Sequence, residues 1–316
     1  MSDHRNYQLL RGIFTGNLAQ VKKAIKKGAD PCWIPPVNES MAMLNDKIHH
    51  TKSLSNFQSV HTPLWNAVST ADNFDNSLKI IQYLCEKGAN SQVNSKCSTN
   101  SKCQVRGAGK KYVEPYFSEA TPFWVASSQL DIDLMKFLQR IGAEDILAPD
   151  SFGTTPLHHA VRVNDSIVLR WLLENSSTET KVLHLDSGSE RAMFSGKSPL
   201  LFSTCYGEME NVLLLLEHGA NVSFRDSLGD DAILTTLLMT ETEQTKQIEF
   251  LTLFCKNSGC IATHNDIGMN PMHVAAQYNL KHVLKWLYVQ PGGKDLINQN
   301  TDQFITPTKK RLMEKQ

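Results

Sequence analysis

The sequence predicts an all-α fold, a solenoid in which short helix-turn-helix units stack in a row. Three observations support this prediction: a proline motif recurs along the chain, a glycine-alanine marker follows it at a nearly constant distance, and the apolar residues between the two have a helical period. Helices this short are not stable alone, so each unit has to bury its apolar face against the next one.

The proline motif marks the start of the first helix of each unit. Threonine, serine and asparagine cap helix N-termini, and proline is favoured at the first helical position. The step from Pro122 to Pro156 is 34 residues and that from Pro199 to Ala232 is 33, which indicates a period near 33 with insertions. The copies are Thr62-Pro63-Leu64, Thr121-Pro122-Phe123, Thr155-Pro156-Leu157, Ser198-Pro199-Leu200, Asn270-Pro271-Met272 and, without proline, Asp231-Ala232-Ile233.

The copy at Pro156 shows how one unit is built. Leu157 and Val161 share a face of the first helix, and Asn164 suits a left-handed turn before the second helix. The second helix then ends at a residue that tolerates positive φ, which is usually glycine. The equivalents of Asn164 in later units are Gly207 and Asn279. The end markers are Gly28-Ala29, Gly88-Ala89, Gly142-Ala143 and Gly219-Ala220.

Residues 150–160 resemble the signature D-x-x-G-x-T-P-L-H-x-A of the ankyrin repeat family, and Asp226 and Asn265 begin looser copies. The resemblance implies a single ankyrin-repeat domain over residues 1–316, with about seven repeats and a partial C-terminal cap. The repeats lie near residues 6–30, 61–92, 120–148, 150–183, 197–225, 226–263 and 265–299, and the cap covers residues 304–316.

The sequence also departs from the family pattern. The histidine after Pro-Leu is kept at His158 and His273 but is replaced by Trp65 and Trp124 in two units and by Leu201 in another. The resemblance implies that this histidine is an internal hydrogen-bonding staple. We therefore expect the units that lack it to be held by packing instead.

Two insertions interrupt the row, at residues 34–58 and 93–117. Loops of this length are either functional or disordered. The first has enough apolar residues for a short helix. The second is rich in serine, lysine and glycine, and we expect it to be flexible.

Composition narrows the class of protein. Lys+Arg and Asp+Glu number 32 each, so the formal charge is zero, which argues against a general nucleic-acid binder. No apolar run is long enough for a membrane span, and the N-terminus lacks the apolar stretch of a secretory signal. The seven cysteines contain no C-x-x-C pair and suit reduced thiols in the cytoplasm. The cluster Lys309-Lys310-Arg311 is of nuclear-localisation type and makes the nucleus an alternative.

The sequence offers little catalytic or cofactor chemistry. Gly196-Lys197-Ser198 invites interpretation as a phosphate-binding loop, but Arg191 stands where that loop needs its first glycine. Cys97 and Cys103 match no common zinc-ligand spacing. The insertions are too short for a catalytic domain. We therefore predict no enzyme activity, no cofactor and no metal site.

One basic stripe remains open to two interpretations. Lys22, Lys23, Lys26 and Lys27 follow each other along the second helix of the first unit. An exposed, solvated helix face is the simpler interpretation, and contact with an acidic partner or a membrane surface is the other.

The resemblance implies that a partner protein binds on the concave surface of the array, which would make the chain a protein-interaction scaffold or adaptor. We expect a monomer, although the sequence leaves the oligomeric state open. A small-ligand sensor of nucleotide type, which would use the groove between repeats, Arg162, lysines and stacking aromatics, is the alternative. The family's hairpin-tip positions are occupied here by Phe152, Leu228 and Ile267, and its first-helix positions by Arg162, Tyr206, Gln277 and Tyr278.

Overall fold

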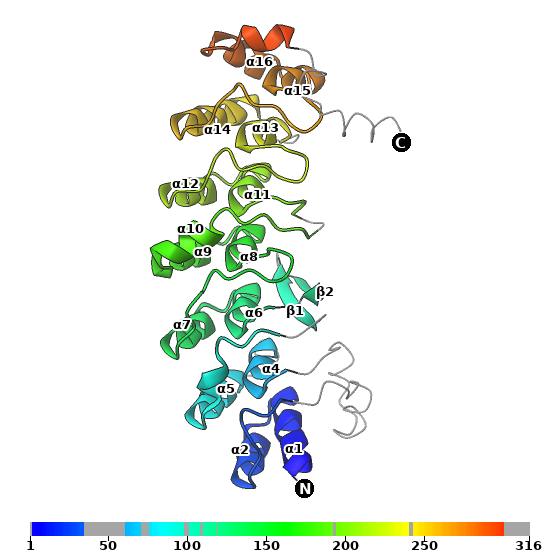
Figure 1. Cartoon of the computed structure of the whole chain (residues 1–316), viewed down its shortest axis with the longest axis vertical. Coiled ribbons are helices and arrows are strands. Elements are labelled where there is room, and N and C mark those ends of the chain that lie inside the picture. Colours follow the sequence, from blue (N-terminus) through cyan, green and yellow to red (C-terminus); the bar gives the residue numbers. More distant parts are fainter. Residues whose placement is uncertain are drawn as a thin grey trace. The chain divides into compact units, whose positions relative to one another are not determined.

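The structure is a computed structural model of the whole chain. It describes residues 2–34, 61–70, 76–97, 101–107, 110–117, 119–191, 194–239 and 243–299. These residues belong to two compact units, Met1–Val163 (unit 1) and Asn164–Gln316 (unit 2). Figure 1 shows the helices of both units along the chain.

Unit 1 consists of helix pairs joined by short turns. Its helices form two layers, because α1 packs on α4, α4 on α6 and α6 on α8, while α2 packs on α5. Within the described residues of unit 1, α1, α4 and α6 each pack against the helix that follows them, α2, α5 and α7. The bounds are α1 (Ser2–Phe14), α2 (Leu18–Lys26), α4 (Pro63–Ser69), α5 (Ser77–Glu86), η3 (Ala89–Gln92), α6 (Pro122–Gln129), α7 (Ile132–Arg140) and α8 (Pro156–Arg162).

Unit 2 repeats this arrangement. The first helices α11, α13 and α15 pack in sequence, and the second helices form the contacts α9 with α12 and α14 with α16. The bounds are α9 (Ser166–Asn175), α10 (Thr178–His184), α11 (Pro199–Cys205), α12 (Met209–Glu217), α13 (Ala232–Leu237), α14 (Gln244–Lys256), α15 (Pro271–Gln277), α16 (Lys281–Val289) and η4 (Asp295–Asn298). No helix in the described part of either unit has the length and apolar character that crossing a bilayer requires.

The helix starts confirm the proline motif. The Thr62 hydroxyl accepts a hydrogen bond from the Trp65 amide at 3.2 Å, and the copy without proline uses the carboxylate of Asp231, which accepts from the Leu234 amide at 3.0 Å. The side chain thus satisfies a backbone donor that the helix leaves unpaired. The predicted turn residues also adopt left-handed conformations, with φ of 54° at Asn164 and at Asn279.

The two retained histidines act as the predicted staples. His158 Nδ1 lies 3.1 Å from the Thr155 amide and 2.9 Å from its hydroxyl. His273 Nδ1 accepts from the Asn270 amide at 3.2 Å, and the Asn270 side chain accepts from the His273 amide at 3.0 Å. Each pair is a reciprocal capping box that holds the first turn of the helix closed.

The two tryptophans correct the prediction that their units are held by packing alone. Trp65 Nε1 donates to the carbonyl of Ala120 at 3.2 Å, and Trp124 Nε1 donates to the carbonyl of Thr154 at 2.6 Å. Both rings are almost fully buried. A buried indole N–H needs an acceptor, and here the acceptor is the loop of the next repeat, so each tryptophan joins two repeats.

The insertion at residues 93–117 contains an antiparallel β hairpin that the sequence analysis did not predict. It consists of β1 (Ser101–Gly107) and β2 (Lys110–Phe117), paired with Val105 opposite Tyr112. Valine and tyrosine have high strand propensity, and Gly107 pairs with Lys110 so that two residues join the strands. Cys97 exchanges backbone hydrogen bonds with Glu119 and Ala120 at the base of the insertion. The repeats are helical as predicted, and this hairpin is the addition to the all-α class.

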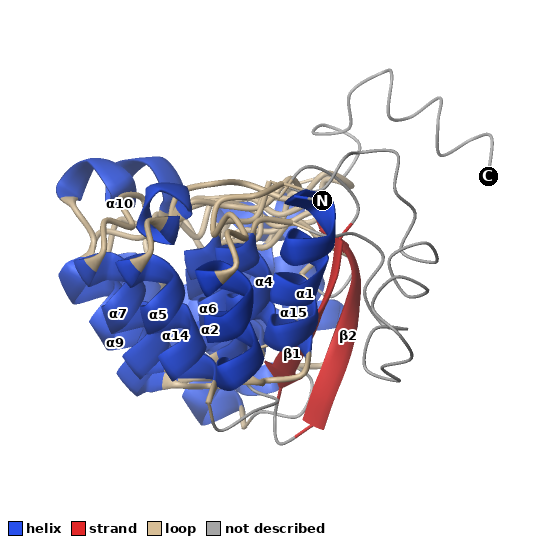
Figure 2. Cartoon of the chain, turned by 90° about the horizontal axis from the view of Figure 1, so that it is seen from below, coloured by secondary structure: helices blue, strands red, loops and turns tan. Residues whose placement is uncertain are grey.

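The hairpin lies beside the first helices of unit 1. β1 contacts α6, and Figure 2 shows the hairpin in red next to the layer that contains α1, α4 and α6. Two further predictions, the cap at residues 304–316 and almost all of the insertion at residues 34–58, lie outside the described residues. The single domain over residues 1–316 stays a prediction.

We expect Trp124→Phe to lower the free energy of unfolding by about 2–3 kcal/mol, because it removes part of a packed ring and one of the two donors to the buried Thr154 carbonyl, leaving only the Asp150 amide. Denaturant titration followed by circular dichroism measures this. Phe123→Leu, a truncation of a buried ring that has no polar atom, is the control and should cost about 1 kcal/mol. Equal losses in the two variants would contradict the role given to the indole N–H.

Candidate functional site: loop tips and first-helix ends

Three loops that precede first helices share one hydrogen-bond pattern. In the loop before α8, the Asp150 carboxylate accepts from the amides of Phe152 at 3.0 Å and Thr154 at 2.9 Å. The Asp150 amide in turn donates to the Thr154 carbonyl at 3.0 Å. Gly153 has a φ of 76°, which this tight turn requires. The aspartate therefore fixes the backbone at the tip of the loop.

The same pattern recurs twice in unit 2. Before α13, the Asp226 carboxylate accepts from the Leu228 and Asp230 amides at 2.9 and 3.0 Å. Before α15, the Asn265 side chain accepts from the Ile267 and Met269 amides at 3.3 and 3.0 Å. Asparagine can replace aspartate because one side-chain oxygen is enough for both bonds.

The two loop tips of unit 2 are bonded to each other. The Asp266 amide donates to the Leu228 carbonyl at 3.0 Å, and the Ser227 amide donates to the Ser195 carbonyl at 3.3 Å. Consecutive tips are therefore adjacent, and Leu228 and Ile267 lie on neighbouring loops. A Cβ atom added at Gly229 would lie only 2.7 Å from the backbone nitrogen of Asp266, which shows how closely the two loops approach each other.

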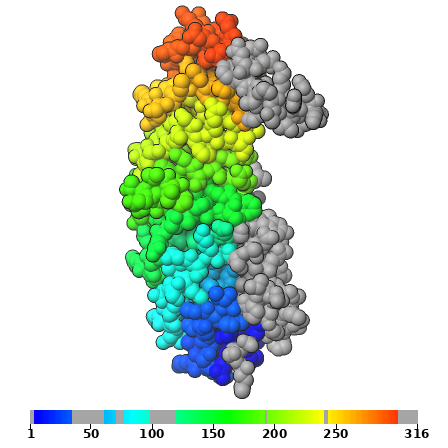
Figure 3. Space-filling view, viewed as in Figure 1, coloured from blue at the N-terminus to red at the C-terminus, as the bar shows by residue number. Residues whose placement is uncertain are grey.

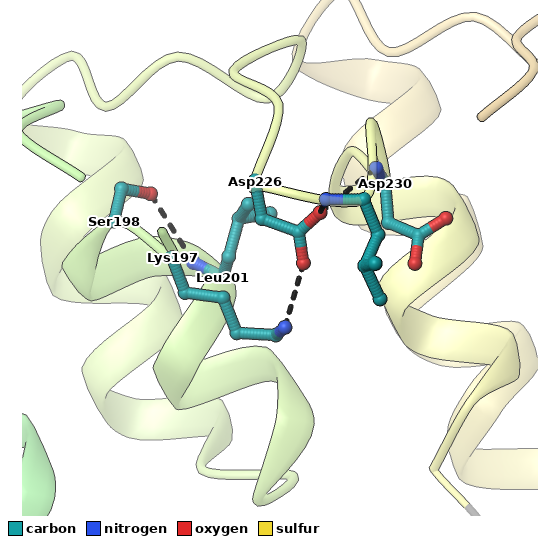
Figure 4. A network of polar contacts seen from close by, with 6 residues as sticks. Lys197, Ser198, Leu201, Asp226 and Asp230 are labelled. Carbon is teal, nitrogen blue, oxygen red and sulfur yellow. Dashed lines mark hydrogen bonds and ion pairs between the residues drawn. The ribbon is translucent and has the colours of Figure 1, made fainter. Parts of the chain in front are cut away.

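An ion pair stabilises the Asp226 loop. Lys197 Nζ lies 2.6 Å from Asp226 Oδ2, and the aspartate side chain is fully buried. Figure 4 shows that one carboxylate oxygen faces Lys197 while the other accepts from the loop backbone. Lys197 belongs to the Gly-Lys-Ser run that was rejected as a phosphate loop, and its ammonium neutralises this buried carboxylate.

Asp230 occupies the place that Thr154 has in the Asp150 loop. Burial raises the pKa of Asp230 to about 6, and the Asp226 carboxylate adds to that rise. A hydrogen bond from Asn265 and the charge of Lys197 oppose it. The carboxyl of Asp230 is thus a buried group that folding disfavours in its charged form.

The predicted site residues fall into two groups. Phe152, at a loop tip, and Arg162, at the end of α8, belong to unit 1 and are half-buried. The other five belong to unit 2 and are exposed: Tyr206, Leu228, Ile267, Gln277 and Tyr278. The structure therefore brings five of the seven predicted residues into one unit, on the loop tips and the C-terminal ends of first helices.

Tyr206 and Tyr278 occupy equivalent places in unit 2. Each is the residue that ends a first helix, α11 for Tyr206 and α15 for Tyr278, and both helices pack on α13. The residue that ends α13, Leu238, is half-buried and was not among the residues predicted from the sequence. Leu238 lies six residues after the helix start at Ala232, one fewer than separate Tyr206 from Pro199, because α13 is one residue shorter than α11.

In the earlier repeats of unit 1, the residues at the C-terminal ends of the first helices are buried. Ser128 and Gln129 at the end of α6 are buried, as are Ser69 and Thr70 at the end of α4. Gln129 Nε2 donates to the carbonyl of Val68 and to that of Ser69, each at 3.2 Å. These side chains stabilise the contact between repeats and do not present a surface to a partner.

The match to a known family accounts for this geometry. Residues 123–226, about a third of the chain, match the family model for ankyrin repeats (3 copies). Residues 123–226 therefore contain ankyrin repeats, in agreement with the resemblance found in the sequence. Ankyrin repeats are generally protein–protein interaction modules. No curated protein matches the chain significantly.

The raised pKa of Asp230 predicts that the stability of the fold depends on pH. Its folded pKa of about 6 lies above the value of about 3.9 expected in the unfolded chain, so the folded state binds more protons between these values. The contribution of the neutral carboxyl to stability is therefore fully present below about pH 4 and is lost as the pH rises through about 6. Asp230→Asn removes this dependence.

We expect Asp230→Asn to stabilise the chain relative to the wild type more at pH 7 than at pH 4.5, as measured by denaturant titration at both values. Glu210→Gln, on an exposed position of α12, is the control and should show no such difference. A stability difference for Asp230→Asn that is the same at both pH values would show that its carboxyl titrates normally.

Proposed function

We propose that the chain is a non-enzymatic protein-interaction scaffold or adaptor, and that a partner protein binds to the tip-and-end face of unit 2. This face consists of the loop-tip residues Leu228 and Ile267 and the first-helix residues Tyr206, Gln277 and Tyr278. The ankyrin-repeat match supports an interaction role, and the geometry of the loops supports the choice of this face.

The observation that carries the proposal is the exposure of large apolar side chains on rigid backbone. Tyr206 is 67% exposed and Leu228 is 60% exposed, and Ile267 and Tyr278 are each 43% exposed. Tyrosine is among the residues that contribute most to binding energy at interfaces. Single exposed apolar residues are common, but here four lie at the repeated positions of adjacent repeats.

The backbone and one ring of this face are ordered before any partner arrives. The Asp226 and Asn265 side chains hold the two loop tips by paired hydrogen bonds. The Tyr206 ring lies 4.9 Å from the Phe202 ring, which in turn lies 4.6 Å from Phe194. Less freedom is lost on binding when contact residues are already positioned, so this order favours affinity.

For the whole chain we propose the solenoid of about seven repeats and a partial cap over residues 1–316. In this arrangement the tip-and-end face would form part of the concave surface. We further propose that the protein acts in the cytoplasm as a monomer, with neither catalytic residues nor a cofactor. The neutral overall charge supports these points, and so do the six described cysteines, none of which forms a disulfide.

The triple variant Tyr206→Ala, Leu228→Ala, Tyr278→Ala tests the face. We expect it to reduce recovery of the partner proteins captured by the wild type at least about tenfold, because it removes three anchors, each worth about 1 kcal/mol or more. Affinity purification with quantitative mass spectrometry measures recovery, and circular dichroism checks that the helices remain.

The matched control changes three exposed apolar residues on second helices of the same unit, Ile167→Ala, Leu213→Ala and Tyr288→Ala. It should leave partner recovery unchanged. If the control loses as much as the triple variant, or if the triple variant loses nothing, the binding face has been assigned wrongly.

A further inference from the structure

A cationic pocket lies in the first repeat of unit 1, between α1 and α2. The residues of these two helices are blue in Figures 1 and 3. The volume of the pocket is about 410 Å³, which is within the range of small-molecule sites. His4 and Arg5 of α1 line one wall, and Lys23 and Lys27 of the α2 segment line the other. Gln8 and Gln20 add polar groups between them.

The pocket stands in a region of strong positive charge. Residues 2–28 contain six lysines and arginines and one aspartate, whereas the whole chain carries 32 of each sign. Within the described part of unit 1, no carboxylate forms an ion pair with Arg5, Lys23 or Lys27. The described residues that line the pocket therefore include these cations but no carboxylate to compensate them.

The helix dipole explains only part of this cluster. Lysines in the last turn of α2 interact favourably with the negative end of that helix. Arg5, however, comes from a different helix, in the first turns of α1. Its guanidinium extends toward the end of α2, since Nη1 would lie 3.0 Å from a Cβ at Gly28. Cations from two helices thus converge on one hollow.

The polar groups of the pocket also suit an anion. Gln20 Nε2 donates to the Gln8 side-chain oxygen at 3.0 Å, which fixes the orientation of the Gln8 amide. The side-chain nitrogen of Gln8, Nε2, makes no hydrogen bond among the described residues and can donate to a ligand. Arginine binds phosphate through two parallel N–H groups and lysine acts as a point charge, so this set can surround several anionic oxygens.

We propose that this pocket binds the phosphate groups of a molecule that carries several of them close together and has no aromatic base. Three permanent cations in one hollow match a ligand with multiple negative charges. Among the described residues, no Phe, Tyr or Trp lines the pocket, so it lacks the large aromatic platform on which a nucleobase would stack. It is a site within one repeat, separate from the groove between repeats considered for a nucleotide-type sensor.

The proposal does not depend on the protein-binding face, which belongs to unit 2. It resolves the two interpretations of the basic stripe on α2. Lys23 and Lys27 line the pocket, whereas Lys22 lies over the Tyr83 ring at 5.4 Å from its centre and so faces α5. Clustered phosphates occur both in soluble inositol phosphates and in lipid headgroups, and the experiment separates these sources.

Isothermal titration of the full chain with myo-inositol hexakisphosphate and with inorganic pyrophosphate tests the site. We expect the wild type to bind, and Lys23→Gln/Lys27→Gln to bind at least about tenfold more weakly. The matched control, Lys26→Gln/Lys79→Gln, removes the same two charges from exposed positions outside the pocket and should change affinity less than about twofold. All four positions are exposed, so both variants are expected to fold, and circular dichroism checks this.

Co-sedimentation with phosphatidylcholine vesicles, with and without a phosphatidylinositol bisphosphate, forms the second arm. Binding of the soluble probes that the pocket variant loses supports a soluble ligand. Binding confined to the phosphoinositide vesicles, and lost in the pocket variant, supports the same phosphate site with a lipid as its source. Equal weakening in the pocket and control variants, or no binding of any probe by the wild type, overturns the proposal.

Discussion

The helices of this protein are too short to be stable without their neighbours. In the described units they range from 6 residues in α13 to 13 residues in α14, and isolated helices of this length are marginal in water. Order therefore comes from contacts between consecutive repeats. Buried side chains supply part of it, and directed hydrogen bonds supply the rest. Trp65 and Trp124 donate to the following loop, and Gln129 donates to the preceding helix end.

The loops are also stabilised by a few directed hydrogen bonds. One side-chain oxygen of Asp150, Asp226 or Asn265 satisfies two backbone amides at a turn that has few partners of its own. Because Asp226 is buried, it also needs Lys197, and a buried charge without such a partner would be costly. Rigid tips follow from this arrangement, and rigid tips are what a protein-binding surface requires. The backbone at the exposed residues Leu228 and Ile267 is therefore held by the buried side chains of Asp226 and Asn265.

Features set by local sequence could be predicted, and features set by contacts between distant residues could not. The helix caps at Thr62 and Asp231, and the left-handed residues Asn164 and Asn279, depend on neighbours within a few positions. The bond from Trp124 to Thr154 joins residues 30 positions apart, and nothing in the sequence says which carbonyl the indole reaches. The hairpin formed by β1 and β2 was not predicted because the lysines and glycines of this segment outweighed its valines and tyrosines. The site residues were placed by family position, which gave the loop tips and helix ends but not their differing exposure in the two units. The pocket between α1 and α2 could not be predicted, because the sequence does not show that Arg5 and Lys27 lie close together in space.

Neighbouring repeats depend on one another for their order, and the Asp226 carboxylate links two of them through Lys197. Hydrogen exchange of unit 2 in Asp226→Ala, compared with the wild type, tests it most directly. This variant removes the acceptor of two loop amides and the partner of Lys197. The account predicts that amides in α11, α13 and α15 lose protection together, because the order of each helix rests on the next. Loss of protection confined to residues 226–230 would contradict it.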